Sequence, residues 1–291
     1  MDHFTASDGE TIHYVRAGAG PPLLFLHGWT SNHREWLPFA TALADRHTCV
    51  CWDARGHGGH PRRGTEGNSI QRMARDLDQL LTHLDLGPVA LLGHSMGALT
   101  LWEYVRRHGC AGLERLVLVD QSPRLLTDDG WDHGIYGDFP DQRNDAFLAR
   151  LEADFAEAVL GLIGEGNNPR ARAAHAADDP ALGRVRDYLR RLDPGPLIEV
   201  WKSLTRADYR DVLPEIRVPT LLVHGDASHF YSVELAEYVR GAIPDARLHV
   251  YQGSDHSPHL WQRERFLADL RAFCAVQNRG AGLSIANRRL P

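Results

Sequence analysis

The sequence predicts an α/β fold: a mostly parallel, doubly wound sheet of eight strands, with a helical block inserted after the sixth strand. Short apolar runs alternate with helical patterns, which is typical of parallel strands covered by helices on both faces. Apolar runs such as residues 22–26 are continuous, as expected of strands buried on both faces. The alternation stops after residue 122 and returns near residue 219.

The expected strands and helices follow from these patterns in chain order. An opening hairpin pairs residues 4–5 with 11–16 through a turn at residues 7–9. Further strands are expected at residues 22–26, 48–52, 89–92, 113–119, 219–223 and 247–251. Helices are expected at residues 35–46, 69–86, 232–243 and 258–276. The second of these helices has apolar residues such as Ile70, Met73 and Leu77 at helical spacing.

The interval between the sixth and seventh strands contains no strand-like run. Its pattern predicts helices at residues 145–163, 170–177, 182–192 and 196–206. We therefore expect a core formed by residues 1–122 and 214–276 and a helical cap formed by residues 123–213. The basic tail, residues 277–291, is expected to be either a loose extension or an arm that packs on a neighbour, which leaves a homodimer open.

Composition argues against several classes of partner. The net charge of −6 gives no electrostatic case for binding nucleic acid or an anionic membrane. No apolar run approaches the roughly 20 residues that cross a bilayer, and the N-terminus lacks the features of a secretory signal. Cys49 and Cys51 lie two apart on an expected strand, so they face the same side and are poorly placed to bridge. We expect a cytoplasmic protein with free thiols.

The most informative motif is the pentapeptide Gly93–Gly97, with the sequence Gly-His-Ser-Met-Gly. It lies between an expected strand and an expected helix, which is the context of a nucleophile elbow. At such a turn the serine is strained and its hydroxyl is exposed at the edge of the sheet. The alternative is a glycine-rich turn whose serine merely caps the helix. The motif in this context predicts that Ser95 is a nucleophile.

Taken with four further motifs, this elbow resembles the lid-bearing branch of the α/β-hydrolase superfamily. The motifs occur in the family's order and are Leu26–Trp29, Asp53–Gly58, Gly93–Gly97, His224–Asp226 and Asp255–Ser257. The resemblance implies the α/β-hydrolase fold and covers nearly the whole chain except the tail. It also implies that Asp53 and Arg55 pin neighbouring loops rather than take part in catalysis.

A nucleophilic serine needs a histidine base and a carboxylate that orients it. His256 is predicted as the base because it follows the last strand in a short loop, at the same sheet edge as the elbow. The family commonly places the acid where this chain has Ser228, which carries no charge. Two acids remain, Asp120 at the end of the sixth strand and Asp226. We favour Asp120, because a carboxylate that ends a buried run needs a partner.

The remaining expected site residues surround the nucleophile. The backbone N–H groups of Met96 and Trp29 are expected to form an oxyanion hole. His27 is placed among the substrate-binding residues, where we expect it to orient the loop rather than act as a second base. Aromatic residues of the inserted segment are expected to line the pocket, although their alternative role is the cap's own core: Trp131, Tyr136, Phe139 and Trp201.

These residues predict a cofactor-free serine hydrolase that cleaves a carboxylic ester or lactone of a small, largely apolar molecule. A carbon–carbon bond hydrolase and a cofactor-free haloperoxidase keep the same triad and remain alternatives. Haloalkane dehalogenases and epoxide hydrolases require a carboxylate nucleophile, which Ser95 is not. A small-molecule receptor without efficient turnover is the alternative of another class. No metal site is expected, since no carboxylate or thiol completes a ligand set with His57 and His60 at metal-like spacing.

Overall fold

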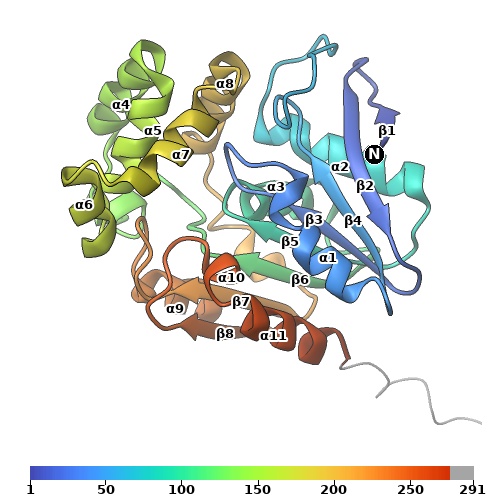
Figure 1. Cartoon of the computed structure of the whole chain (residues 1–291). Helices are drawn as coiled ribbons and strands as arrows, with labels where there is room; N and C mark the ends of the chain where they lie inside the picture. Colours follow the sequence, from blue (N-terminus) through green and yellow to red (C-terminus); the bar gives the residue numbers. More distant parts are fainter. Residues whose placement is uncertain (276–291) are drawn as a thin grey trace, which may run out of the picture.

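A computed structural model describes residues 1–275 and places eight strands in one sheet (Figure 1). The strand order is β1-β2-β4-β3-β5-β6-β7-β8, and all neighbours are parallel except the β1/β2 and β2/β4 pairs. The strands are β1 (Asp2–Thr5), β2 (Thr11–Ala17), β3 (Pro22–Leu26), β4 (Thr48–Asp53), β5 (Val89–His94), β6 (Leu113–Val119), β7 (Thr220–Gly225) and β8 (Ala246–Tyr251). The expected eight-stranded, doubly wound α/β architecture is confirmed.

Helices cover both faces of this sheet. On one face lie α1 (Leu37–Leu43), α10 (Pro258–Trp261) and α11 (Arg263–Ala275), and on the other lie α2 (Ile70–Leu84), α3 (Met96–His108) and α9 (Val233–Ala242). A hydrophobic core lies on each face of the sheet, and successive side chains of β3 enter opposite cores. Phe25 packs in the core beneath α1 and α11, whereas Leu24 packs in the core beneath α2 and α3. Both cores are apolar, which explains why the buried strands read as continuous hydrophobic runs.

Five helices follow β6 and precede β7, and Figure 1 shows them gathered above the sheet, in green to gold. They are α4 (Asp141–Ala153), α5 (Phe155–Gly164), α6 (Pro169–Ala176), α7 (Pro180–Leu189) and α8 (Pro194–Thr205). Short 3₁₀ turns occur at His33–Glu35, Ile135–Gly137 and Leu213–Glu215. The last three α-helices of this group begin with proline after an Asn or Asp that caps the N-terminus, at Asn168, Asp179 and Asp193.

Two expected helices are each divided in the structure. The helix expected at 145–163 breaks at Asp154, whose extended backbone ends α4 and whose carboxylate accepts the N–H of Glu157 to cap α5. The closing helix breaks at Gln262 between α10 and α11. The predicted tail, 277–291, lies outside the described residues. Within residues 1–275, no helix combines the length and the apolar character needed to cross a bilayer.

Arg55 joins distant parts of the core through a buried ion-pair network. Its guanidinium donates two hydrogen bonds to Asp76 on α2, at 2.6 and 2.9 Å, and two to Asp8 in the β1–β2 turn, at 3.0 and 3.1 Å. All three side chains are almost completely buried. This supports the expected loop-pinning role of Arg55, since it ties the first hairpin to α2.

We expect Arg55→Met to lower the free energy of unfolding by about 3–5 kcal/mol, because the buried carboxylates of Asp8 and Asp76 would lose the guanidinium that binds both and would share Arg72. Urea denaturation measures this change. Arg46→Met is the matched control: the Arg46–Asp45 pair is exposed, at 84% and 67% of the side-chain surface, and its loss should cost less than about 0.5 kcal/mol. Equal stability of the two variants would contradict the structural role given to Arg55.

Candidate active site

Ser95 lies at a strained turn between β5 and α3. Its backbone has φ 51° and ψ −116°, a conformation that a non-glycine residue rarely adopts. Its N–H donates to the carbonyl of Val119 on the neighbouring strand, at 3.1 Å. The flanking glycines permit the turn: a Cβ on Gly93 would lie 2.6 Å from the backbone of Gly97, and one on Gly97 would lie 2.4 Å from the Leu26 carbonyl.

Ser95 lines a cavity of about 700 Å³ between the sheet edge and the helices that follow β6. His256 lines the same cavity, as do apolar side chains such as Leu99 of α3 and Val159 of α5. A cavity of this size, largely apolar with a few polar groups, is typical of sites for small molecules. The structure thus brings the predicted nucleophile and the predicted base to one cavity.

Asp120 and His256 form the contact expected of an orienting acid and its base. Asp120 directly follows β6, has φ 46°, and accepts a hydrogen bond at Oδ1 from His256 Nδ1 at 2.9 Å. Because an ionised carboxylate only accepts hydrogen bonds, Nδ1 carries the ring proton and Nε2 keeps its lone pair. Nε2 forms no hydrogen bond with other groups of residues 1–275. The imidazole is therefore in the tautomer that can accept a proton in the cavity.

The Asp120 carboxylate is fully buried and is satisfied by four groups. Besides His256, Oδ1 accepts the hydroxyl of Ser228 at 2.8 Å, and Oδ2 accepts the Gly225 N–H at 2.9 Å. His224 Nδ1 lies 3.4 Å from Oδ2. Burial alone would raise the pKa of Asp120, but His224, His256 and the Gly225 N–H favour the anion and hold the pKa below its usual value. Ser228, the unusual residue at the family's common acid position, thus donates to the acid from β6.

Asp226, the alternative acid, does not contact His256. Its side chain is exposed, and Oδ1 accepts the N–H of Gly253 at 2.6 Å, which stabilises the turn after β8. Of the two carboxylates that the sequence left open, the structure therefore brings only Asp120 to His256.

The expected oxyanion-hole groups lie on two segments beside Ser95. Met96 is the first residue of α3, where the N–H has no partner inside the helix, and Trp29 belongs to the loop after β3. Neither N–H donates to an acceptor within residues 1–275. Gly28 lets this loop approach closely, because a Cβ there would lie 2.9 Å from His94 Nδ1. Both N–H groups are thus free to face a substrate oxygen.

The Trp29 side chain connects the loop after β3 to the helices above it. Its indole N–H donates to the Leu197 carbonyl of α8 at 2.9 Å, and its ring packs 4.8 Å from that of Trp201. Nearby, the Tyr188 hydroxyl of α7 donates to the Thr30 carbonyl at 2.6 Å. Two helices of the inserted segment are therefore bonded directly to the loop that carries the Trp29 N–H.

Of the five expected substrate-binding residues, Trp201 lines the cavity and four do not. His27 is fully buried, with Nδ1 2.8 Å from the Gly28 carbonyl and Nε2 accepting the Ala54 N–H, so it supports the loop as expected but does not reach the cavity. Trp131 packs against Tyr238 on α9 and donates to the Arg124 carbonyl.

For Tyr136 and Phe139 the prediction of a place in the cavity lining is also wrong, because both side chains are engaged elsewhere. Tyr136 donates its hydroxyl to the Leu162 carbonyl, and Phe139 is buried against Phe147 and Trp201. Apolar rings of the inserted segment pack against one another in the continuous hydrophobic core on this side of the sheet, and that packing takes up Tyr136 and Phe139. The cavity instead receives Phe230 and Tyr231 from the loop after β7, and Phe230 packs edge-on to His256 at 4.6 Å. No sequence signal singled out these two residues.

Comparison with known proteins places this architecture in a family. A protein-family model described as the alpha/beta hydrolase fold matches residues 21–262 of this chain. This chain belongs to the α/β-hydrolase family. It is 29% identical over 279 residues to a non-heme haloperoxidase from Rhodococcus erythropolis, covering 94% of this chain and 99% of that protein. It is also 29% identical over 274 residues to a non-heme chloroperoxidase from Kitasatospora aureofaciens, covering 92% and 98% of the two chains.

Solved structures agree with this assignment. An esterase from Exiguobacterium antarcticum superimposes with a TM-score of 0.80 at 26% identity, covering 94% of this chain and 98% of the esterase. The family relationship accounts for the shared fold. The substrate is a separate question, because one fold supports many reactions.

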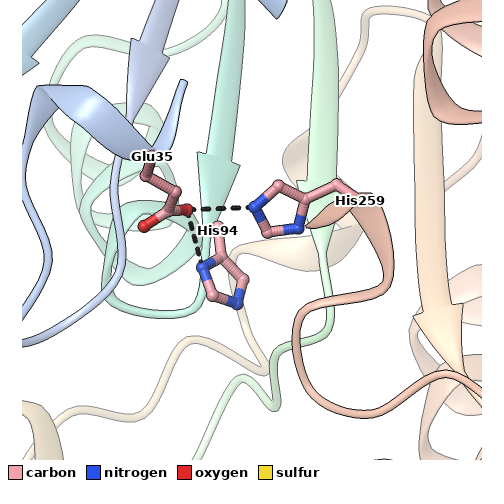
Figure 2. Close-up of side chains that lie close together, drawn as sticks. All are labelled: Glu35, His94 and His259. Atoms are coloured by element: carbon pink, nitrogen blue, oxygen red, sulfur yellow. Dashed lines mark hydrogen bonds and ion pairs between the residues drawn. The ribbon is translucent and has the colours of Figure 1, made fainter. Parts of the chain in front are cut away.

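A second polar cluster of this α/β-hydrolase lies directly behind the elbow, and the sequence analysis missed it. Figure 2 shows Glu35, His94 and His259, which come from the turn after β3, from β5 and from α10. Their ligand atoms lie within 4.8 Å of one another, close enough to share a metal ion or a network of protons. In the sequence, His94 stood out only as a variable position of the pentapeptide, and Glu35 was only an acid at the start of an expected helix.

The close approach at Gly97 gives a test of the elbow of this α/β-hydrolase. Gly97→Ala should lower the free energy of unfolding by about 1–3 kcal/mol, because its Cβ would overlap the Leu26 carbonyl. Gly183→Ala, in α7 where no atom lies within 4 Å of the added Cβ, should be neutral or stabilising by up to about 1 kcal/mol. Thermal or urea unfolding compares the two. A Gly97→Ala protein as stable as the wild type would refute the packing given for the turn.

Proposed function

We propose that this α/β-hydrolase is a serine hydrolase that cleaves a carboxylic ester or lactone of a small, largely apolar substrate. The observation that carries the proposal is the hydrogen bond from His256 Nδ1 to the buried Asp120 carboxylate, in a cavity shared with the strained Ser95. This contact leaves His256 Nε2 as a proton acceptor. The relatives' names, haloperoxidase and esterase, are compatible with acyl transfer on such a triad.

In the proposed reaction, His256 Nε2 takes the proton of the Ser95 hydroxyl as its oxygen attacks the substrate carbonyl. The carbonyl electron pair moves to oxygen, and the backbone N–H groups of Met96 and Trp29 stabilise the resulting oxyanion. The oxyanion collapses, the carbon–oxygen bond of the leaving group breaks, and His256 gives that oxygen the proton. His256 then takes a proton from water, whose oxygen attacks the acyl carbon. The bond between that carbon and the Ser95 oxygen breaks, His256 returns the proton to the serine oxygen, and the acid is released.

Charge in the cavity suits His256 to this role near neutral pH. Burial lowers the pKa of His256, and the Asp120 carboxylate raises it in part, so the net pKa lies below the ordinary histidine value. The base is therefore neutral at pH 7, and kcat/KM is expected to fall only as the pH drops through this lowered pKa.

One prediction of the proposed function concerns the nucleophile. A fluorophosphonate probe should label the full chain once, on Ser95, and block hydrolysis of p-nitrophenyl acetate. Ser95→Ala should escape labelling and lose at least about 10⁴-fold in kcat while keeping its fold. Ser31→Ala is the control, because Ser31 lines the same cavity. Ser31→Ala should still be labelled. Turnover by Ser95→Ala at the wild-type rate would remove Ser95 from the mechanism.

A panel of esters, lactones and β-diketones, with and without hydrogen peroxide and bromide, then assigns the reaction. Faster turnover of esters or lactones than of diketones supports the proposal. Preferential carbon–carbon cleavage would contradict it. Halogenation of a dye in the presence of a carboxylic acid and peroxide would mean that peroxide replaces water in the second step. A single slow turnover on every ester would favour the receptor alternative.

Another prediction separates the two carboxylates. Asp120→Asn should lower kcat by roughly 10³- to 10⁴-fold, because an amide stabilises the wrong tautomer of His256. Asp226→Asn should leave kcat/KM close to the wild type, since its carboxylate contacts Gly253 rather than the base. Steady-state kinetics on the preferred ester measures both. The opposite ranking would assign the acid to the loop after β7.

A further inference from the structure

The Glu35 carboxylate contacts three segments of the site, and the proposed mechanism uses none of these contacts. Oε1 lies 2.8 Å from His94 Nδ1 and 3.2 Å from His259 Nε2 (Figure 2). Oε2 accepts the N–H of Gly28, in the loop that carries the Trp29 N–H, at 3.1 Å. His94 Nε2 in turn lies 2.9 Å from the backbone carbonyl of His256. One acid thus connects the loop after β3, the elbow and the loop of the base.

These contacts determine the protonation state of His94. Nδ1 faces a carboxylate and Nε2 faces a carbonyl, and both partners only accept hydrogen bonds when Glu35 is ionised. Both ring nitrogens must then carry hydrogen, so His94 is an imidazolium. Burial lowers the pKa of His94, but the adjacent Glu35 outweighs this and the net pKa is raised. The pKa of Glu35 lies well below its usual value: burial would raise it, but His94 and His259 lower it.

His259 is the neutral member of the cluster. Its Nε2–H donates to Glu35, whereas its Nδ1 is buried with no partner in residues 1–275, beside the rings of Trp36 and Phe266. A buried N–H without an acceptor is costlier than an unused lone pair, so Nδ1 carries no proton. Burial lowers the pKa of His259 to about 4. The cluster therefore holds one negative and one positive charge, which balance.

We propose that His94 and Glu35 are positioning residues: an imidazolium at His94 fixes the backbone of the base through the His256 carbonyl, and Glu35 fixes that imidazolium and the loop of the Trp29 N–H. This inference rests on the proposed function, in which His256 is the base. It deepens that function by adding a charged support that links base, nucleophile turn and oxyanion hole.

The charge on His94 also affects the pH at which His256 becomes protonated. The two rings lie 4.9 Å apart between centroids, so the imidazolium opposes a second positive charge on His256. The other titratable groups that face His256 are Asp120, which favours its protonation, and His229, which disfavours it. Those that face His94 are Glu35, Asp120, His256 and His259. His94 therefore extends the active range of the base to lower pH.

Glu35→Gln removes the charge and keeps the hydrogen bonds to Gly28 and His94, at the cost of the one from His259. The amide oxygen can accept the Gly28 N–H, and the amide nitrogen can donate to His94 Nδ1, so that His94 becomes neutral and still donates from Nε2 to the His256 carbonyl. We expect the acid limb of the kcat/KM profile to move up by about one pH unit, with kcat at its plateau nearly unchanged. An acid limb that does not move would overturn the proposal.

His94→Phe removes both the charge and the bond to the His256 carbonyl. Its acid limb should move up at least as far as that of Glu35→Gln, because the Glu35 carboxylate remains and favours protonation of His256. Its plateau kcat should fall by about tenfold, because a misoriented base costs rate at every pH. Asp53→Asn is the matched control. Asp53 accepts hydrogen bonds from the backbone and ring of His33, in the same short turn as Glu35, but does not contact His94. Its pH profile should coincide with that of the wild type.

Nuclear magnetic resonance tests the charge without reference to turnover. Imidazole nitrogen shifts of the wild-type protein, with the His94 signals identified by their loss in His94→Phe, should show both nitrogens protonated at pH 7. A neutral His94 ring at pH 7 would overturn the assignment. So would stoichiometric zinc found by elemental analysis after incubation with zinc alone, because a metal would take the lone pair of Nδ1. If no ester is turned over, the proposed function fails while the spectrum still decides the charge.

Discussion

The buried carboxylate of Asp120 is the constraint on which the arrangement of the site depends. A negative charge at the end of β6, with no exposure to solvent, is stable only if donors surround it. Those donors come from the strand and loop of β7 and from the loop after β8. Satisfying one charge therefore fixes three segments that are far apart in the sequence, and one of them carries His256. The strained turn at Ser95 lies against the same edge, because its N–H is bonded to the last residue of β6.

Ser228 shows how a departure from a family pattern can be read physically. A serine cannot replace a carboxylate as the partner of an imidazolium, and here it does not: it donates its hydroxyl to Asp120 from the position where relatives commonly have the acid. The same hydroxyl also accepts the N–H groups of Phe230 and Tyr231, at 3.3 and 3.4 Å. The residue thus supports the acid and shapes the loop that supplies two walls of the cavity.

Strand positions and the convergence of Ser95, Asp120 and His256 were predictable because they follow from local signals. Continuous apolar runs mark buried parallel strands, and the carboxyl ends of such strands meet at one edge. The sequence could not predict which aromatic residues reach the cavity. Tyr136 and Phe139 are of the same residue types as Tyr231 and Phe230, which do line the cavity, and only the packing of the folded chain decides which of them reach it. Glu35 was equally hidden, because a carboxylate in an expected helix carries no mark of its three distant partners.

The bonds from Trp29 to Leu197 and from Tyr188 to Thr30 have a mechanical consequence. Helices above a pocket usually regulate entry, whereas a backbone donor beside the nucleophile belongs to the chemistry. Here the two are physically tethered, so α7 and α8 cannot swing away from the sheet without breaking these bonds or pulling the Trp29 backbone with them. Any displacement of α7 and α8 that widened the cavity would consequently also disturb the segment that holds the Trp29 donor.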